Sequence, residues 1–177
     1  MSIQKFMQSH GQPLQKADGE HVFMQGDKDT SLYYVQEGLL KAYYVTEYGK
    51  EQIKSFFVPD VVIGSLTAVF AKDICTYSLV CLEPCKLIKI PFETIYNQSR
   101  NDMEMAGEFI DILLNLVIKK ERREYEFLCL SAEERYQYLA KQSPEFLERV
   151  TQENVAKYLG ITPVALSRIK KRISGAQ

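Results

Sequence analysis

Cationic and hydroxyl side chains recur along one short segment near the C-terminus, comprising Ser167, Arg168, Lys170, Lys171 and Arg172. From Arg149 onward the sequence holds six lysine and arginine residues against a single acid, Glu153, whereas residues 1–98 hold nine lysines against eleven acids. Arginine can donate two hydrogen bonds to guanine, and lysine can neutralise a phosphate. Cations near the end of a helix are stabilising in any protein. Their concentration on one segment nevertheless favours an interface with DNA.

The basic segment belongs to a predicted helix-turn-helix that spans residues 151–172. Thr151 and Thr162 are placed to cap two short helices, and Pro163 takes a first helical position, where its missing N–H costs nothing. Gly160 between the helices tolerates the positive φ of a tight corner. The apolar residues repeat at helical spacing and predict the packed face of the motif, which comprises Val155, Ala156, Leu159, Leu166 and Ile169.

In a helix-turn-helix, the second helix enters the major groove of DNA and the first helix crosses the phosphate backbone. The residues expected on the DNA-facing side are Thr151, Gln152, Thr162, Val164, Ser167, Arg168, Lys170 and Lys171. Arg168 is the candidate for reading a guanine, and Val164 can offer an apolar contact to a thymine methyl group.

Composition narrows the class of protein. Hydrophobic residues make up 46% of the 177-residue chain, which suits a soluble globular protein. No apolar run approaches the ~20 residues of a membrane span, and the N-terminal sequence lacks the apolar core of a signal peptide. We therefore expect a cytoplasmic protein without membrane contact. The formal net charge of -1 conceals the basic segment, so local charge is the better guide to nucleic-acid binding.

The histidines and cysteines give no metal-binding pattern. The sequence has two histidines, His10 and His21, and the four cysteines at positions 75, 81, 85 and 129 lack Cys-x-x-Cys spacing. We therefore expect no catalytic residues, no metal site and no cofactor. Cysteines of a cytoplasmic chain are expected to be reduced and buried, with a thiol sensor as the alternative.

A β domain is predicted between residues 18 and 90. Short runs of strand-forming residues alternate there with turn residues at intervals of about 8 to 12, as in sandwiches and barrels. The predicted strands cover residues 21–24, 32–36, 39–46, 52–57, 61–63, 76–82 and 86–90. Residues 1–16 are expected to form a lead-in helix that ends at Gln12-Pro13.

A long helix is predicted for residues 101–127, between shorter helices at 92–98 and 131–142. Its apolar residues form a broad stripe at helical spacing, which could pack on the barrel. A helix of this length spans about 40 Å, however, and exceeds a small barrel, so a second copy of the chain is the expected partner. The residues assigned to dimerisation are Met105, Phe109, Ile112, Leu113 and Leu116.

These elements predict an α+β chain with an N-terminal jelly-roll-like β-barrel in residues 1–98, a dimerisation helix in residues 99–128 and a helix-turn-helix domain in residues 129–177. Local motifs follow in a recognisable order, namely Gln25-Gly26-Asp27, Leu32-Tyr33-Tyr34-Val35, Gly49-Lys50-Glu51, Ile63-Gly64, Leu159-Gly160-Ile161-Thr162 and Leu166-Ser167-Arg168-Ile169. Their order and the element order resemble the CRP/FNR family of bacterial transcription regulators, over nearly the whole chain.

The resemblance implies a homodimer with a cyclic-nucleotide-binding-like effector barrel, dimerisation through the long helix, double-stranded DNA bound by the second helix of the motif, and RNA polymerase as a further partner. Ser167 and Arg168 match a base-reading pair of the family, whereas Val164 stands where a glutamate is expected. We expect two further differences between this chain and the family. The chain should lack the family's β wing, and an iron–sulfur cluster is not expected because the first cysteine is Cys75.

The effector pocket implied by the resemblance comprises Ile63, Gly64, Ser65, Leu66, Cys75 and Thr76. Relatives that bind cyclic nucleotides carry a glutamate after this glycine and an arginine before the serine or threonine, whereas this chain has Ser65 and Cys75. Residues 1–99 contain no arginine that could pair with the cyclic phosphate. We therefore expect that the barrel does not bind cyclic AMP tightly, and that the effector is another small molecule or is absent.

Two other functions remain open from the sequence. One is a cyclic-nucleotide-type sensor that acts on a protein partner, against which the basic helix-turn-helix argues. The other is a cupin-like enzyme, which would need a cluster of histidine and carboxylate ligands that this sequence lacks.

Overall fold

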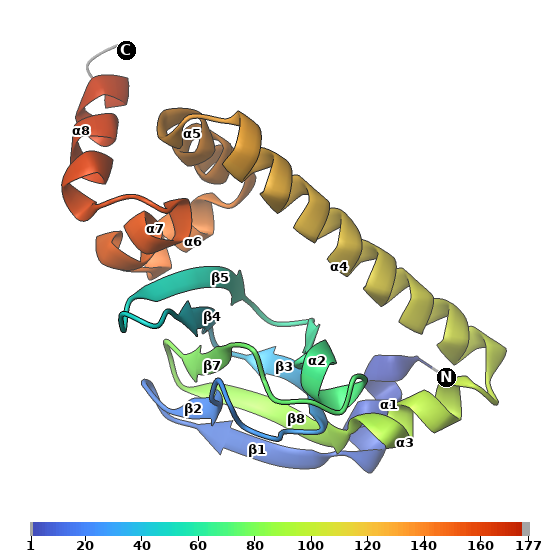
Figure 1. Cartoon of the computed structure of the whole chain (residues 1–177). Coiled ribbons are helices and arrows are strands. Elements are labelled where there is room, and N and C mark those ends of the chain that lie inside the picture. Colours follow the sequence, from blue (N-terminus) through green and yellow to red (C-terminus); the bar gives the residue numbers. More distant parts are fainter. Residues whose placement is uncertain (1, 175–177) are drawn as a thin grey trace.

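The computed structural model describes residues 2–174 and consists of a β-barrel, a long helix and a C-terminal group of short helices (Figure 1). The N-terminal helix is α1 (Ile3–His10), and the strands are β1 (Gln12–Lys16), β2 (His21–Phe23), β3 (Ser31–Glu37), β4 (Leu40–Val45), β5 (Glu51–Phe57), β6 (Val62–Ile63), β7 (Ser78–Cys81) and β8 (Cys85–Pro91). The remaining helices are α2 (Leu66–Val69), α3 (Phe92–Ser99), α4 (Met103–Cys129), α5 (Ala132–Gln142), α6 (Pro144–Arg149), α7 (Gln152–Leu159) and α8 (Pro163–Ser174).

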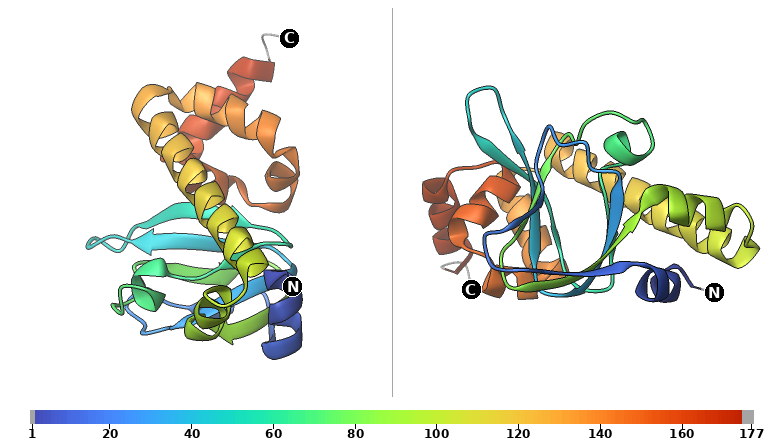
Figure 2. Two further views of the ribbon diagram at one scale, coloured as in Figure 1. Left: turned by 90° about the vertical axis from the view of Figure 1, so that its right-hand side faces the viewer. Right: turned by 90° about the horizontal axis from the view of Figure 1, so that it is seen from below.

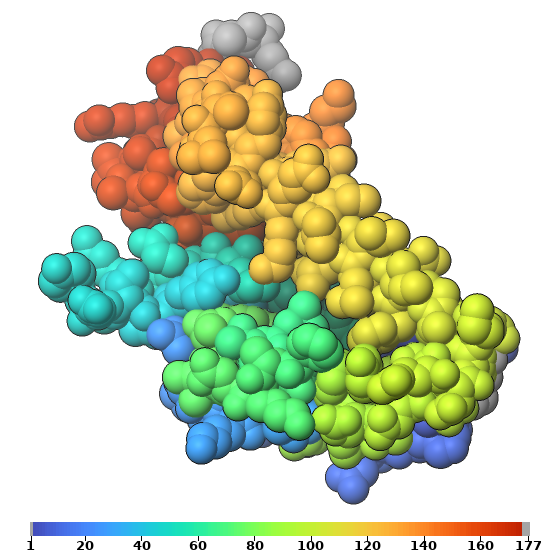
Figure 3. All heavy atoms as spheres, turned by 45° about the vertical axis from the view of Figure 1, so that its right-hand side comes forward, coloured from blue at the N-terminus to red at the C-terminus, as the bar shows by residue number. Residues whose placement is uncertain are grey.

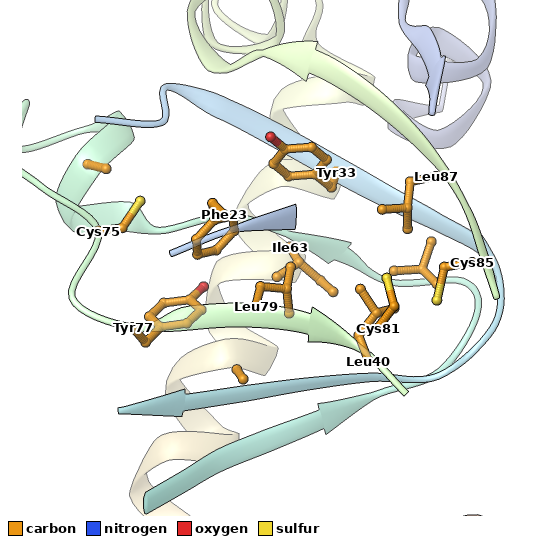
Figure 4. Packing of buried hydrophobic residues seen from close by; sticks show 13 residues of the cluster. Phe23, Tyr33, Leu40, Ile63, Cys75, Tyr77, Leu79, Cys81, Cys85 and Leu87 are labelled. Atoms are coloured by element: carbon orange, nitrogen blue, oxygen red, sulfur yellow. The ribbon is translucent and has the colours of Figure 1, made fainter. Parts of the chain in front are cut away.

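The barrel closes two antiparallel four-stranded sheets around one interior, as the view along it shows (Figure 2). The strand orders are β1-β8-β3-β6 and β2-β7-β4-β5, which confirms the predicted jelly-roll-like architecture. Side chains from both sheets meet inside, among them Phe23, Tyr33, Leu40, Leu79 and Leu87 (Figure 4). Burial of these apolar side chains supplies the main stabilising term of the barrel.

The first strand is not predicted by the sequence. Residues 12–16 pair antiparallel with β8, from Gln12 opposite Lys89 to Lys16 opposite Cys85, so the expected helix over residues 1–16 ends at His10 instead. β1 is an edge strand, the position in a sheet at which a residue without an N–H, such as Pro13, is tolerated. The expected lead-in helix is therefore confirmed for residues 3–10, and the expectation was wrong for residues 12–16, which form a strand.

The long helix α4 runs diagonally from the barrel to the C-terminal helices (Figure 1). Asp102 caps its amino end by accepting a hydrogen bond from the backbone N–H of Met105, at 3.1 Å. The first turns pack on α1 and α3, and Met105 is wholly buried there beside residues such as Ile3 and Phe92. No helix among residues 2–174 is long and apolar enough to cross a membrane.

The C-terminal helices dock on the outer face of β4 and β5 through a third buried cluster, which includes Phe56, Val155 and Leu159. Ion pairs border this contact. The guanidinium of Arg149 donates to both carboxylate oxygens of Glu83, at 3.1 and 2.7 Å. The described part of the chain is therefore joined into one body by apolar packing and by charged contacts across it.

The cysteines differ in their environments. Cys75, Cys81 and Cys85 are buried as expected, but Cys129, the last residue of α4, is exposed. No group of three or more histidine, cysteine or acidic side chains within residues 2–174 could hold a metal ion. The predicted domain ranges also include Met1 and residues 175–177, which lie outside the described residues.

Candidate DNA interface

The corner between α7 and α8 is built from the residues that the sequence singled out. Gly160 has a φ of 71°, in the left-handed region that favours glycine. The following N–H, that of Ile161, donates to the carbonyl of Ala156 at 3.0 Å and closes the end of α7. The φ of Gly160 and the hydrogen bond from Ile161 are both local features. This corner therefore sets the direction in which the chain enters α8.

Each helix of the motif has its predicted cap. The hydroxyl of Thr151 accepts from the N–H of Asn154 at 3.2 Å, and the hydroxyl of Thr162 accepts from the N–H of Ala165 at the same distance. The predicted packed face is also confirmed, because Val155, Ala156, Leu159, Leu166 and Ile169 are all buried. Substituting such a cap by alanine costs about 1 kcal/mol.

The outer face of α8 carries residues that are predicted to contact the bases of DNA. Val164 is 62% exposed, and Ser167, Arg168 and Lys171 are exposed at the three- and four-residue spacings that place them on one side of a helix. Figure 2 shows α8 at the outer edge of the molecule, away from the barrel. These four side chains therefore form a continuous surface that a groove of DNA could receive.

The other predicted contact residues lie around the amino ends of the two helices. Thr151, Gln152 and Thr162 are exposed there. Lys170 is only half-buried, and its Nζ donates to Oε1 of Gln152 at 3.0 Å, so it joins α8 to α7. Within the described residues this contact makes Lys170 a positioning group as well as a source of charge.

Not every cation of the basic segment is free. The guanidinium of Arg172 lies 2.6 Å from the carboxylate of Glu133 on α5, and Lys157 pairs with both Glu51 and Glu153 at 3.4 and 2.9 Å. Burial raises the pKa of the Glu51 carboxyl, but the hydrogen bonds and charges of Lys41 and Lys157 outweigh burial and hold that pKa below its usual range. These ion pairs hold the helices of the motif in place, and they do not belong to its DNA-facing surface.

Two arginines that sequence patterns do not distinguish tie the motif to the end of α4. Arg135 donates from Nη1 to the carbonyl of Leu130 at 2.7 Å and from Nη2 to the carbonyl of Leu159 at 3.1 Å. Arg123 donates from Nη2 to the carbonyl of Tyr158 at 2.5 Å. These carbonyls lie at helix C-termini, where cations are favourable. The contacts of Arg135 with Leu159 and of Arg123 with Tyr158 join residues 24 and 35 positions apart in the sequence, which is why local patterns gave no signal.

The five residues assigned to dimerisation face the chain's own barrel. Met105 is wholly buried, and the other four line a small hollow of about 50 Å³ against the barrel and α3. In the single chain the first half of α4 therefore lies along its own protomer, and the assignment of Met105, Phe109, Ile112, Leu113 and Leu116 to a second copy stays a prediction. A different apolar face of α4 is exposed, formed by Ile110, Leu114, Val117 and Ile118, each between 53% and 57% exposed.

The predicted effector residues lie at the end of the barrel near α2. Ile63 and Cys75 belong to the packed interior, and the carbonyl of Gly64 accepts from the hydroxyl of Tyr77 at 2.9 Å. The other three differ, since Ser65 is buried while Leu66 and Thr76 are exposed. The structure thus brings the six residues into one region, where their inward side chains contribute to an apolar core.

Comparison with known proteins identifies the class. Residues 14–102 match the cyclic nucleotide-binding domain family. The fumarate and nitrate reduction regulatory protein of Salmonella typhi is 30% identical over 171 residues, covering 90% of this chain and 67% of the relative. The transcriptional activator protein anr of Pseudomonas aeruginosa is 28% identical over 179 residues, covering 92% and 69%. The chain thus spans about two thirds of the length of these relatives.

The FixK2 protein of Bradyrhizobium japonicum has a similar solved structure, with a TM-score of 0.78 at 14% identity, covering 94% of this chain and 85% of that protein. At this identity the likeness shows the fold alone. A cyclic-nucleotide-binding-type barrel joined by a long helix to a helix-turn-helix is the architecture of DNA-binding transcription regulators. The chain belongs to the CRP/FNR family, whose members bind DNA and act as dimers. The relatives named above are regulators and not enzymes, in agreement with the sequence-based expectation.

Proposed function

We propose that this protein is a cytoplasmic, homodimeric transcription regulator that binds a palindromic operator in double-stranded DNA through α8. The observation that carries the proposal is the exposed face of Val164, Ser167, Arg168 and Lys171 on a helix whose position is held by a left-handed glycine and two threonine caps. A helix presented in this way fits the width of the major groove.

Each side chain has a distinct role in this proposal. Arg168 donates two hydrogen bonds to a guanine, Val164 contacts a thymine methyl group and Ser167 bonds a base edge or a phosphate. Lys171 neutralises phosphate, and the hydroxyls and amides at the amino ends of the helices, from Thr151, Gln152 and Thr162, contact the backbone. Lys170 acts mainly by holding Gln152 in place.

Two copies of the motif would place two α8 helices on successive half-sites, which explains the need for a dimer. The exposed apolar face of α4 supports self-association through that helix. RNA polymerase is the further partner that a regulator bound at a promoter would contact. An effector, where one exists, is a small molecule other than cyclic AMP.

The operator can be obtained by selection. Purified protein is incubated with random duplexes at moderate salt, and retained DNA is sequenced over several rounds. Enrichment of two inverted half-sites supports the proposal, and the spacing of their centres should be about 10 base pairs or a multiple of that number. Uniform retention of all sequences would instead favour a sensor that acts on a protein partner.

The first substitution test concerns base reading. Arg168→Ala is expected to weaken binding to the selected operator by about 1 to 3 kcal/mol and to leave binding to random DNA nearly unchanged. Lys171→Ala is the matched control on the same exposed face. It should weaken both kinds of binding and lower the slope of log K against log salt by about 0.9. Fluorescence anisotropy over a salt series measures both. Equal losses on both DNAs for Arg168→Ala would assign that residue to phosphate.

The second test concerns the barrel. Calorimetric titration with cyclic AMP and cyclic GMP should show no binding at micromolar concentration, because the segment around Ser65 and Cys75 offers no cationic partner for a cyclic phosphate. In addition, Cys75 is packed with Ile63 in the barrel interior. Micromolar binding of either nucleotide, at one molecule per chain, would show that the interior can reopen and that this expectation is wrong.

A further inference from the structure

Two of the buried cysteines flank one short connection at the end of the barrel. β7 ends at Cys81 and β8 begins at Cys85, and the residues between them are Leu82, Glu83 and Pro84. Because β7 and β8 belong to different sheets, this connection crosses from one sheet to the other. Both cysteine side chains belong to the interior apolar cluster, and they are 0% and 2% exposed (Figure 4). The two thiols are therefore enclosed together at one end of the barrel.

The backbone on both sides of this connection is held by neighbouring segments. The N–H of Cys81 donates to the carbonyl of Glu20 at 3.0 Å, and the carbonyl of Cys81 accepts from the N–H of Gly19 at 2.9 Å. Cys85 is paired with Lys16 of β1. Since each cysteine is fixed by contacts outside the connection, the barrel framework determines how the two thiols lie relative to each other.

The two thiols are in hydrogen-bond contact. The Cys85 thiol donates its proton to the carbonyl of Glu83 at 3.1 Å, so the Cys81 thiol is the donor between the two sulfurs. This hydrogen bond holds the pKa of Cys85 below its ordinary value, against the effect of burial, and it raises the pKa of Cys81, as burial also does. A thiol pair in which one member stabilises the thiolate of the other is a reactive arrangement, unlike two isolated buried thiols.

The turn between β3 and β4 covers Cys85 with backbone at Gly38. An added Cβ at Gly38 would lie 2.4 Å from Sγ of Cys85 and 2.8 Å from the carbonyl oxygen of Pro84, so this position has no room for a side chain. A small oxidant such as hydrogen peroxide therefore meets backbone atoms at this point and has no packed side chain of residue 38 to displace.

The other two cysteines lie elsewhere. Figure 4 shows Cys75 at the opposite end of the interior cluster, and Cys129 is exposed at the end of α4. A disulfide forms without backbone movement only between cysteines whose Cα atoms lie within about 7 Å. Of the four cysteines, Cys81 and Cys85 are thus the two whose thiols the structure places in contact.

We propose that Cys81 and Cys85 form a reversible intramolecular disulfide when the protein meets hydrogen peroxide. The Cys85 thiolate attacks one peroxide oxygen, so that an S–O bond forms, the O–O bond breaks, and the departing hydroxide takes up the proton that Cys85 lost. The sulfur of Cys81 then attacks the sulfenic sulfur of Cys85. The S–S bond forms, the S–O bond breaks, and the leaving hydroxide carries away the thiol proton of Cys81 as water. Two thiols are oxidised and one peroxide is reduced to two waters, and a dithiol reverses the reaction by exchange.

The disulfide affects the C-terminal helices through Glu83. This residue lies inside the loop that the disulfide closes, and its carboxylate accepts two hydrogen bonds from Arg149 of α6. α6 also packs on β5, where the ring centroids of Phe146 and Phe56 are 5.8 Å apart, and Figure 3 shows the C-terminal helices in contact with this strand. Two thiol sulfurs must approach to about 2 Å to bond, so closure of the loop shifts Glu83 relative to Arg149. This regulatory consequence rests on the proposed function, whereas disulfide formation does not.

Mass spectrometry of the full chain tests disulfide formation. Reduced protein is treated with a small molar excess of hydrogen peroxide under native conditions, the remaining thiols are alkylated in denaturant, and the chain is cleaved after glutamate without reduction. Cleavage after Glu83 separates the two cysteines, so their peptides stay joined only through a disulfide. We expect a joined pair of peptides that is lighter by two hydrogen atoms than the two reduced peptides together. Treatment with a dithiol should separate the pair.

Alanine variants distinguish the roles of the two sulfurs. Cys85→Ala should leave Cys81 reduced, whereas Cys81→Ala should stop at a sulfenic acid on Cys85, which dimedone traps. Cys75→Ala is the matched control, because it removes a buried thiol from the same cluster, and it should form the disulfide as the wild-type chain does. The proposal is overturned if Cys81 and Cys85 both remain open to alkylation after peroxide, or if Cys75→Ala abolishes the joined peptides. A sulfenic acid on Cys81 in Cys85→Ala, with none in Cys81→Ala, would overturn the assignment of Cys85 as the attacking sulfur.

Fluorescence anisotropy with the selected operator tests the regulatory consequence. Oxidation should weaken operator binding by about two- to fivefold, which is the weight of one ion pair whose side chains are about one-third exposed. A dithiol should restore the affinity. Arg149→Gln removes the ion pair and should bind the operator equally before and after oxidation. Equal affinity of the oxidised and reduced wild-type chains would overturn the regulatory consequence and leave the disulfide standing, whereas absence of operator binding in both states would contradict the proposed function alone.

Discussion

The double variant Ile110→Lys, Leu114→Lys is expected to sediment as a monomer at concentrations at which the wild-type chain sediments as a dimer. Both side chains are apolar, lie one turn apart on α4 and are 55% and 54% exposed in the single chain. Burying such a side chain stabilises by about 1.5 to 3 kcal/mol. A symmetric interface counts each residue twice, so lysines at both positions should weaken self-association by more than about a thousandfold.

The same variant should lose specific DNA binding. A monomer engages one half-site, whereas a dimer gains the second half-site at a high effective concentration. Anisotropy with the selected operator should show at least a hundredfold loss, while circular dichroism should stay unchanged, because neither residue belongs to a buried cluster of its own protomer.

A matched control moves each lysine one position along the helix. Asp111→Lys, Asn115→Lys adds the same two side chains at the same spacing, on exposed polar positions of α4. This variant should remain a dimer. If the variant Ile110→Lys, Leu114→Lys also remained dimeric, α4 would not be the dimer interface. If the control variant were monomeric, added charge alone would disrupt the dimer.

The two apolar stripes of α4 show what periodicity can and cannot predict. Spacings of three and four residues identified α4 as an amphipathic helix, but they fit two adjacent stripes, one through Phe109 and Ile112 and one through Ile110 and Leu114. Which stripe packs on the barrel depends on contacts with α1, more than a hundred residues earlier, such as the 2.6 Å hydrogen bond from the N–H of Ile3 to Glu108. Such a contact leaves no trace in the local sequence.

The helix-turn-helix was predictable because its signals are local. A threonine cap, a glycine corner and a proline at a first helical position each act within four residues, and all of them have the expected geometry. β1 was missed for the opposite reason. A five-residue edge strand that contains Pro13 has little strand character alone, and its pairing partner β8 lies some seventy residues away.

The cavity of about 930 Å³ between β5 and the C-terminal half of α4, which seven lysine and arginine side chains line, could not be predicted from the sequence for a related reason. The run from Lys119 to Glu124 is typical of a solvated helix face, and Lys54 is one polar residue in a partly alternating strand. Only the passage of α4 over β5, together with the bulge at Lys54, turns these two segments toward each other. The charge was visible in the sequence, but its concentration in one recess is a property of the tertiary structure.

Gly160→Ala is expected to lower the free energy of unfolding by about 2 to 5 kcal/mol, from two separate causes. The φ of 71° is in the left-handed region, where a side chain costs about 1 to 2 kcal/mol. A Cβ would also lie 2.9 Å from Cε1 of Phe127, closer than packed carbons approach, and overpacking of this kind costs about 1 to 3 kcal/mol. The Phe127 ring has little freedom to move aside, because the guanidinium groups of Arg123 and Arg135 lie 4.4 and 4.9 Å from its centroid.

Gly49→Ala is the matched control for this prediction. Gly49 has nearly the same φ, 74°, in the turn between β4 and β5, but a Cβ there would meet no atom within 4 Å. It should therefore lose only the conformational cost of about 1 to 2 kcal/mol, and the difference between the two variants in urea unfolding isolates the contact with Phe127. Operator affinity should fall for Gly160→Ala alone, because α8 takes its direction from this corner. Equal losses of stability would mean that the ring yields without cost and that the backbone conformation alone requires the glycine.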